Sequence, residues 1–64
     1  MKMIIRHRGH DYIGTKEIVS GEEERTINGI YEYLDQLKKL RFPTEEGVVL
    51  LGEQAVKEVV IIFK

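Results

Sequence analysis

Residues 22–41, EEERTINGIYEYLDQLKKLR, decide the fold that the sequence predicts. Apolar side chains recur in this stretch every three or four positions, which is the period of a helix with one buried stripe. The stripe comprises Ile27, Ile30, Leu34 and Leu37. Acidic residues crowd the start of the stretch and basic residues its end, as the helix dipole favours. We therefore expect one amphipathic helix over 22–41, ended at Phe42–Pro43 because the residue before proline avoids helical torsion angles.

Two short motifs bear on this helix. Ser20-Gly21-Glu22-Glu23 matches a capping box, in which Ser20 and Glu23 would each bond the other's backbone N–H. Asn28-Gly29 is also a strong signal for a two-residue hairpin turn. The leucines that follow at three-residue intervals do not fit a strand, so a helix is the prediction. Gly29 then costs about 1 kcal/mol relative to alanine, and we expect it to allow a close approach of the sheet.

The segment before the helix reads as a β-hairpin. Residues 2–8 and 12–19 are rich in β-branched and aromatic side chains, which favour strands. Residues 8–11, Arg-Gly-His-Asp, carry the chemistry of a turn. The apolar alternation of the second strand changes face near Gly14, which indicates a β-bulge there.

The segment after the helix predicts two more strands. Residues 48–51, Val-Val-Leu-Leu, form a short apolar run after a glycine. Residues 53–63 fit either a helical stripe or a strand, and the β-branched run of 59–63 favours a strand over 56–63. We expect this strand to pair with 48–51 through a turn at 52–55.

The predicted architecture is therefore a two-layer α+β fold in ββαββ order, with all of residues 1–64 in a single domain. A four-stranded, mostly antiparallel sheet would carry one helix on one face. A chain of this length buries only about 60% of its unfolded surface, so its core is thin. It has no cysteine, which excludes disulfides and cysteine-based zinc sites as support.

Charge and hydropathy exclude several classes of protein. Ten basic and eleven acidic residues give a net charge of −1, which is not the balance of a typical nucleic-acid binder. No segment approaches the ~20 apolar residues of a membrane helix, and the first residues lack a signal-peptide core. We expect a cytoplasmic protein with no membrane association. Its size and charge content are typical of small bacterial or phage-encoded accessory proteins.

An apolar, helix-free sheet face is the main functional hypothesis. A strand buried on one face should alternate apolar and polar residues, but 48–51 and 59–63 are apolar on both sides. Exposed apolar patches usually mark interfaces, so we expect a homodimer or a protein partner on that face. The candidate interface residues are Val48, Leu50, Val60, Ile61, Ile62 and Phe63. The sequence leaves open whether Val60 and Ile62, or instead Val59, Ile61 and Phe63, face outward.

The alternative hypothesis is nucleic-acid binding through the basic N-terminal hairpin. Its candidate contacts are Arg6, Arg8, Tyr12 and Lys16, with Arg6 and Arg8 on one strand face and Tyr12 as a stacking surface. So few charges predict weak binding, because strong non-specific binding takes more phosphate contacts.

No residue pattern predicts catalysis. No serine or threonine stands in a nucleophile motif, and no glycine-rich loop precedes a helix. His7, His10 and Asp11 resemble a metal cluster, but the ligands that would complete a zinc site are missing. We expect no catalytic residues, no metal and no cofactor, and we interpret the chain as a non-enzymatic interaction protein.

Overall fold

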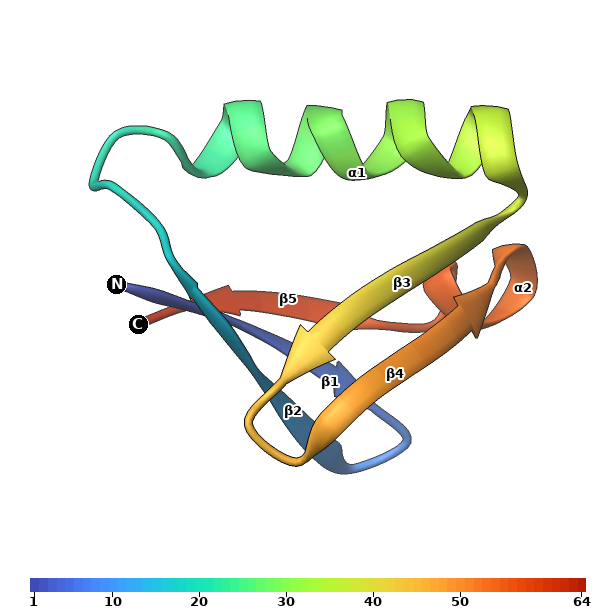
Figure 1. Cartoon of the computed structure of the whole chain (residues 1–64), viewed down its shortest axis with the longest axis horizontal. Coiled ribbons are helices and arrows are strands. Elements are labelled where there is room, and N and C mark those ends of the chain that lie inside the picture. Colours follow the sequence, from blue (N-terminus) through green and yellow to red (C-terminus); the bar gives the residue numbers. More distant parts are fainter.

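One long helix lies across a five-stranded antiparallel sheet in the computed structural model of residues 1–64 (Figure 1). In chain order the elements are β1 (Lys2–His7), β2 (His10–Glu17), α1 (Glu23–Leu37), β3 (Lys39–Thr44), β4 (Gly47–Gly52), α2 (Glu53–Val56) and β5 (Val60–Phe63). The strand order across the sheet is β4-β3-β2-β1-β5, and every neighbouring pair is antiparallel. The α+β class is confirmed, with five strands in place of the expected four.

The N-terminal hairpin is confirmed, with a tighter turn than predicted. His7 pairs with His10, so only Arg8 and Gly9 form the loop. Both have positive φ, 52° and 80°. Positive φ at both positions is required by the two-residue hairpin turn whose twist matches that of the strands. Arg8 therefore lies in the turn and does not share a strand face with Arg6, contrary to our expectation.

The irregularity predicted at Gly14 is present. Ile4 pairs with Ile13, but Lys2 pairs with Glu17, so β2 contains extra residues between these two pairs. Gly14 is buried within this irregular stretch. A Cβ placed on it would lie 2.8 Å from Cζ of Phe42, so the absent side chain makes room for that ring.

The helix is shorter than predicted at its C-terminal end. Lys38 adopts a left-handed conformation, with φ 60°, and its N–H donates to the Leu34 carbonyl at 2.7 Å. This bond closes the helix without a glycine or a proline. The prediction that it continues to residue 41 is wrong, because 39–44 alternate exposed and buried side chains as β3.

The predicted capping box forms only in part. Glu22 occupies the N-cap position, and no side chain caps the first turn. Ser20 therefore does not take the predicted role. Glu23 does reach back, and its Oε1 accepts from the Gly21 N–H at 2.5 Å.

The C-terminal segment is half helix and half strand. Residues 53–56 form α2, which buries Val56 and carries the chain to the opposite edge of the sheet. There β5 pairs with β1, with Ile61 beside Ile5. The predicted hairpin between 48–51 and 56–63 is therefore wrong, because β1 presents a second apolar strand with which β5 pairs.

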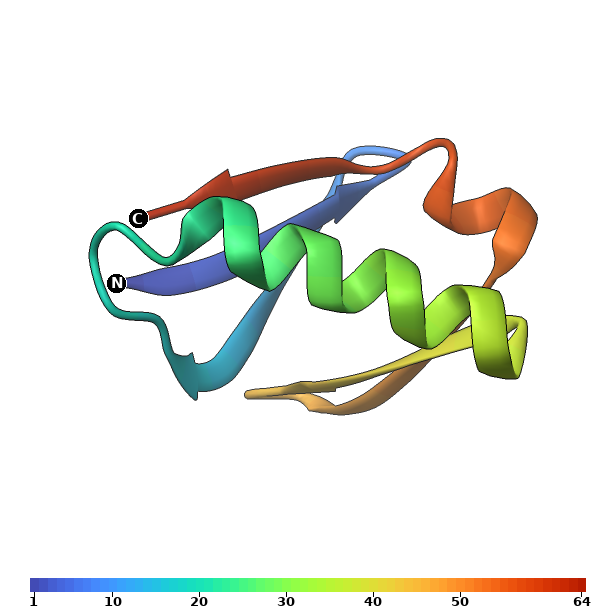
Figure 2. The same cartoon turned by 90° about the horizontal axis from the view of Figure 1, so that it is seen from above.

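The core lies between α1 and the sheet. Figure 2 shows α1 crossing diagonally above the strands, from the side of β5 and β1 towards β3. The buried hydrophobic residues are Met3, Ile5, Ile18, Ile30, Leu34, Leu40, Phe42, Leu51 and Val56. Only Ile5 is completely inaccessible. With 11 of 64 residues buried, each core side chain contributes a large share of the packing.

Candidate functional site

Strand β4 exposes two large apolar side chains on the helix-free side of the sheet. Val48 and Leu50 are 50% and 64% exposed, whereas Leu51 is buried in the core. Val49 is half-buried and packs against that core. Exposed and buried side chains therefore alternate along β4, although its residue types do not alternate between apolar and polar. Apolar side chains occupy both faces of β4, as the sequence predicted.

The same strand forms an unpaired edge of the sheet. β3 is its only neighbour in the sheet, and Figure 2 shows the hairpin of β3 and β4 on the side of the molecule away from β5. In an antiparallel strand, every second residue turns its N–H and C=O away from the paired neighbour. Natural edge strands are usually protected by charges, proline or bulges. Residues 47–52, Gly-Val-Val-Leu-Leu-Gly, contain no charge and no proline.

The opposite edge strand, β5, resolves the question of which residues face outward. Ile4 lies between Ile62 and Ile13 in the strand pairing, so these three share one face. Val60 is on the same face as Ile62 and is 54% exposed. Val59, Ile61 and Phe63 instead pack against the core. Of the predicted interface residues, Ile61 and Phe63 therefore turn inward.

The two outward apolar regions start from opposite edges of the sheet. The isoleucine row extends from β5 across β1 to Ile13 of β2, so β3 lies between it and β4. β4 and β5 are its two edges, with three strands between them. The isoleucine row beside β5 is also bordered by charge, because Arg6 pairs with Val60 on one side and with Asp11 on the other. β4 contains no charge of its own, and it is bordered by a single one, because Leu50 pairs with Arg41 of β3.

The basic residues of the hairpin are largely paired with carboxylates. Arg6 Nε donates to Asp11 Oδ1 at 2.7 Å, and its Nη2 donates to Oδ2 at 3.1 Å. These bonds hold the pKa of Asp11 below its ordinary value and raise that of Arg6. At the turn, Glu58 lies 3.5 Å from Arg8 Nη2 and 3.3 Å from His7 Nε2.

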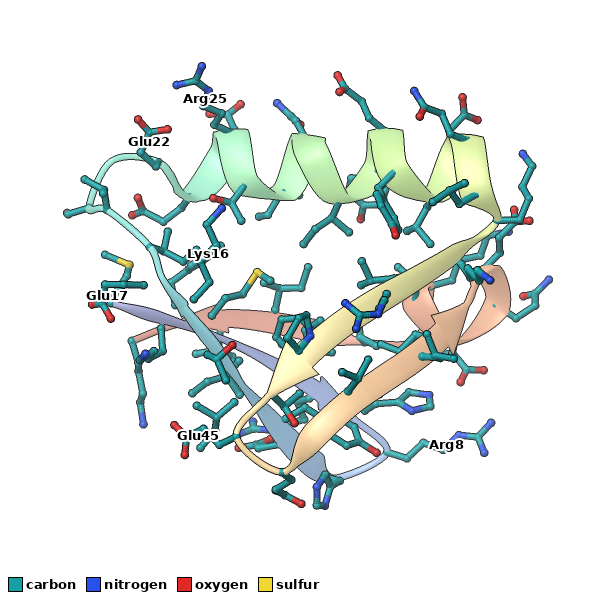
Figure 3. The ribbon with its side chains drawn as sticks, in the orientation of Figure 1. Arg8, Lys16, Glu17, Glu22, Arg25 and Glu45 are labelled. Carbon is teal, nitrogen blue, oxygen red and sulfur yellow. The ribbon has the colours of Figure 1, made fainter.

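The structure does not gather the four predicted nucleic-acid contacts on one surface. Tyr12 pairs with the buried Ile5 and packs on the core, with its ring 4.5 Å from that of His10. Lys16 lies far from the turn, near the end of β2, where Figure 3 shows it beneath α1. Arg8 lies at the opposite end of the hairpin (Figure 3).

Each histidine lies beside a single glutamate. His7 and His10 are cross-strand partners, but no three His, Asp or Glu side chains are placed to hold a metal ion. His10 lies 3.8 Å from Glu46, on a different strand pair. At the other end of the sheet, the Met1 amino group donates to Glu17 at 2.7 Å and lowers the pKa of that carboxyl.

A pocket under α1 was not predicted. It has a volume of about 390 Å³ and lies between the irregular part of β2 and strand β3. Its apolar wall includes Ile30, Leu40 and Phe42, and its two charged lining residues are Lys16 and Arg41. The only signals for it in the sequence are the two glycines that also line it, at positions 14 and 29.

The chain matches no known protein-family model, and comparisons with curated proteins and with solved structures found no match. Neither helix has the length and apolar character that crossing a membrane would require.

Proposed function

We propose that the chain is a small interaction module that forms a homodimer by antiparallel pairing of β4 with β4 of a second copy. One observation carries this proposal: the unpaired edge strand is also the strand that exposes Leu50 and Val48 without any charge. An edge with these properties is a template for another strand. The free backbone groups would gain partners, and the exposed side chains would gain cover.

The geometry of self-pairing follows from symmetry. Two identical antiparallel strands related by a two-fold axis present the same surface to each other. With the axis beside Val49, Val48 of one copy lies opposite Leu50 of the other. Both pairs then lie on the helix-free side of the joined sheet, where each apolar side chain contacts its counterpart.

Charge at the ends of β4 modulates this contact. Glu46 precedes the strand and Glu53 follows it. In the register centred on Val49, the acidic ends of the two copies come close together. Since salt screens exposed charges of like sign, the dimer should become tighter as ionic strength rises. The contact is small, so the dimer population should also depend on protein concentration.

Light scattering across a concentration series tests the proposal. The wild-type mass should rise from 7.5 kDa towards twice that value, and Leu50→Lys should remain at the monomer mass. Leu50 is 64% exposed, so the substitution leaves the fold intact, which far-UV circular dichroism checks. Val19→Lys is the matched control, because Val19 is 68% exposed in the loop before α1.

A substitution on β5 tests which of the two exposed apolar edges forms the dimer contact. Val60→Lys places the same charge on β5, whose side chain is 54% exposed. It should leave dimerisation unchanged. A monomeric wild-type chain at every concentration would refute the proposal. So would dissociation by Val60→Lys together with a Leu50→Lys variant that still dimerises.

Nucleic-acid binding through the N-terminal hairpin receives less support. Arg6 and Arg8 both face carboxylates, at Asp11 and Glu58. A cation already paired with a carboxylate has less to gain from a phosphate. Lys16, the remaining predicted cation, lies at a different end of the strand.

A further inference from the structure

The pocket under α1 exists because β2 and β3 separate. The two strands pair only at Gly14 and Thr44. On one side of this position, the Glu45 N–H still donates to the Ile13 carbonyl at 3.0 Å. On the other side β2 is irregular and β3 contains Pro43, which has no N–H to donate. The strands diverge there, and α1 covers the space between them.

Two glycines shape this space in opposite ways. Gly14 is in close contact with the Phe42 ring, so that wall is tightly packed. Gly29 faces open space, since a Cβ added to it would meet no atom within 4 Å. Gly29 is exposed and lies beside the buried Ile30, so the helix leaves space at the edge of the pocket. A volume of about 390 Å³ is within the range of pockets that hold small molecules.

The charged lining of the pocket has one sign only. Lys16 and Arg41 line it, and no aspartate or glutamate does. Arg41 pairs with Leu50, so its side chain leaves β3 on the helix-free face, at the outer side of the gap between β2 and β3. Neither the Lys16 nor the Arg41 side chain has a carboxylate oxygen within 4 Å of a charged nitrogen. By contrast, Lys2, Arg6, Arg8 and Arg25 each have a carboxylate within 4 Å. Figure 3 shows Lys16 extending from β2 towards the underside of α1.

Hydroxyl groups accompany the two cations. Thr26 and Tyr33 of α1 line the pocket, on the helix turns before and after Gly29. The Thr26 hydroxyl already donates to the Glu22 carbonyl at 2.8 Å, which leaves its lone pairs free. Tyr33 is 39% exposed, and its phenol makes no hydrogen bond within the chain that would compete with a ligand.

We propose that this pocket binds a small organic anion with an apolar body, specifically a carboxylate attached to a hydrocarbon chain of medium length. The hydrocarbon lies against Ile30, Leu40 and Phe42, where Gly29 leaves space. The carboxylate lies at the mouth between Lys16 and Arg41. Such a ligand covers apolar surface that α1 leaves open and meets two cations that have no other partner.

Titration of the ¹⁵N-labelled chain with octanoate, followed by NMR, tests this proposal. Octanoate should shift the amide signals of Gly14 and Gly29 with saturable dependence on concentration. 1-Octanol has the same chain without charge, and octyltrimethylammonium carries the opposite charge. Octanoate should bind about fivefold more tightly than 1-octanol, as expected for exposed ion pairs, and the cation should bind more weakly than either.

Two sets of variants separate the apolar part of the site from the charged part. Gly29→Leu places a side chain in the open space, where its Cβ meets no atom within 4 Å, and should reduce the affinity for octanoate and for 1-octanol at least about tenfold. Asn28→Leu adds the same side chain at the neighbouring helix position, outside the pocket lining, and should leave both affinities unchanged. The double variant Lys16→Gln/Arg41→Gln should weaken octanoate alone and remove its advantage over 1-octanol.

Three results would overturn the proposal. The first is that octanoate fails to shift the Gly14 and Gly29 amides. The second is binding that Gly29→Leu leaves unchanged, since the ligand would then lie elsewhere, for instance against Leu50 of β4. The third is equal affinity for octanoate and octyltrimethylammonium, which would mean that Lys16 and Arg41 do not select an anion.

Discussion

Replacing Gly14 with alanine should destabilise the domain strongly, although it adds only one methyl group. The new Cβ would lie 2.8 Å from Cζ of Phe42, 3.1 Å from its Cε1 and 3.0 Å from the Met3 carbonyl oxygen. Gly14 does not have a positive φ, so alanine suits its torsion angles. The cost therefore comes from contact alone.

The structure sets the size of that cost. Carbon atoms pack best at about 3.5 Å or more, so the Phe42 ring would have to retreat by roughly 0.7 Å. The ring is buried, and the Met3 carbonyl belongs to the backbone of β1, so neither neighbour moves freely. Overpacking of this kind costs about 1–3 kcal/mol. A domain of this size has a free energy of unfolding of roughly 3–10 kcal/mol, so the loss is a substantial fraction.

Urea unfolding followed by circular dichroism measures the effect. With a slope of about 1 kcal/mol per molar urea, the midpoint should fall by roughly 1–3 M while the slope stays unchanged. Gly29→Ala is the matched control, because its Cβ meets nothing and alanine is the better helix former. Its midpoint should rise by about 1 M, from a gain of about 1 kcal/mol.

A second substitution tests the cause. Phe42→Leu removes the ring atoms that meet the new methyl group, so Gly14→Ala should cost less in that background than in the wild type. If Gly14→Ala leaves the urea midpoint where it was, the packing of Phe42 on Gly14 is not what requires a glycine. An equal cost in both backgrounds would likewise refute the assignment to Phe42.

Three further predictions concern the stability at acid pH, the C-terminal end of α1 and the hydrophobic core. The pKa of Asp11 is lowered by its bond to Arg6, so its contribution to stability is present above about pH 4 and is lost as the pH falls through the folded-state pKa. Asp11→Asn should therefore flatten the fall in urea midpoint below about pH 4, and an unchanged pH profile would contradict this. Lys38→Gly should raise the melting temperature by a few degrees, because glycine relieves a left-handed conformation that costs about 1 kcal/mol, and a lower melting temperature would argue against it. Ile5→Ala, at the only completely inaccessible side chain, should cost about 2–5 kcal/mol, and a cooperative thermal transition near that of the wild type would contradict this expectation.

The sequence predicted elements whose signals are local. The hairpin of β1 and β2, the irregularity near Gly14 and the start of α1 each depend on residues close together in the chain. Strand β3 was missed because Leu37 and Leu40 also continue the helical period. The helix ends at Lys38 through a left-handed residue that is neither glycine nor asparagine, so the usual stop signal is absent.

The sequence pattern could not predict features that depend on residues far apart in the chain. β5 had two apolar strands with which to pair, and nothing in its residues distinguishes β4 from β1. The apolar surface was predicted from the runs at 48–51 and 59–63, but their placement at opposite edges depends on strand order. The pocket depends on how far β2 and β3 separate. Gly29 was expected to permit a close approach of the sheet, whereas it faces open space and Gly14 has that role.

The single pairing between β2 and β3 divides the sheet into two units of unequal resistance to opening. β1 is bonded along most of its length to β5 on one side and, apart from the irregularity near Gly14, to β2 on the other, whereas the hairpin of β3 and β4 meets β2 at one residue pair. Detachment of that hairpin breaks few backbone bonds to β2 and separates Leu40, Phe42 and Leu51 from the rest of the core. Amide hydrogens of β3 and β4 should thus exchange with solvent together, at a lower free energy than those of β1. A molecule held under α1 would contact both units at once, so its arrival would slow exchange in the hairpin more than in the rest of the sheet.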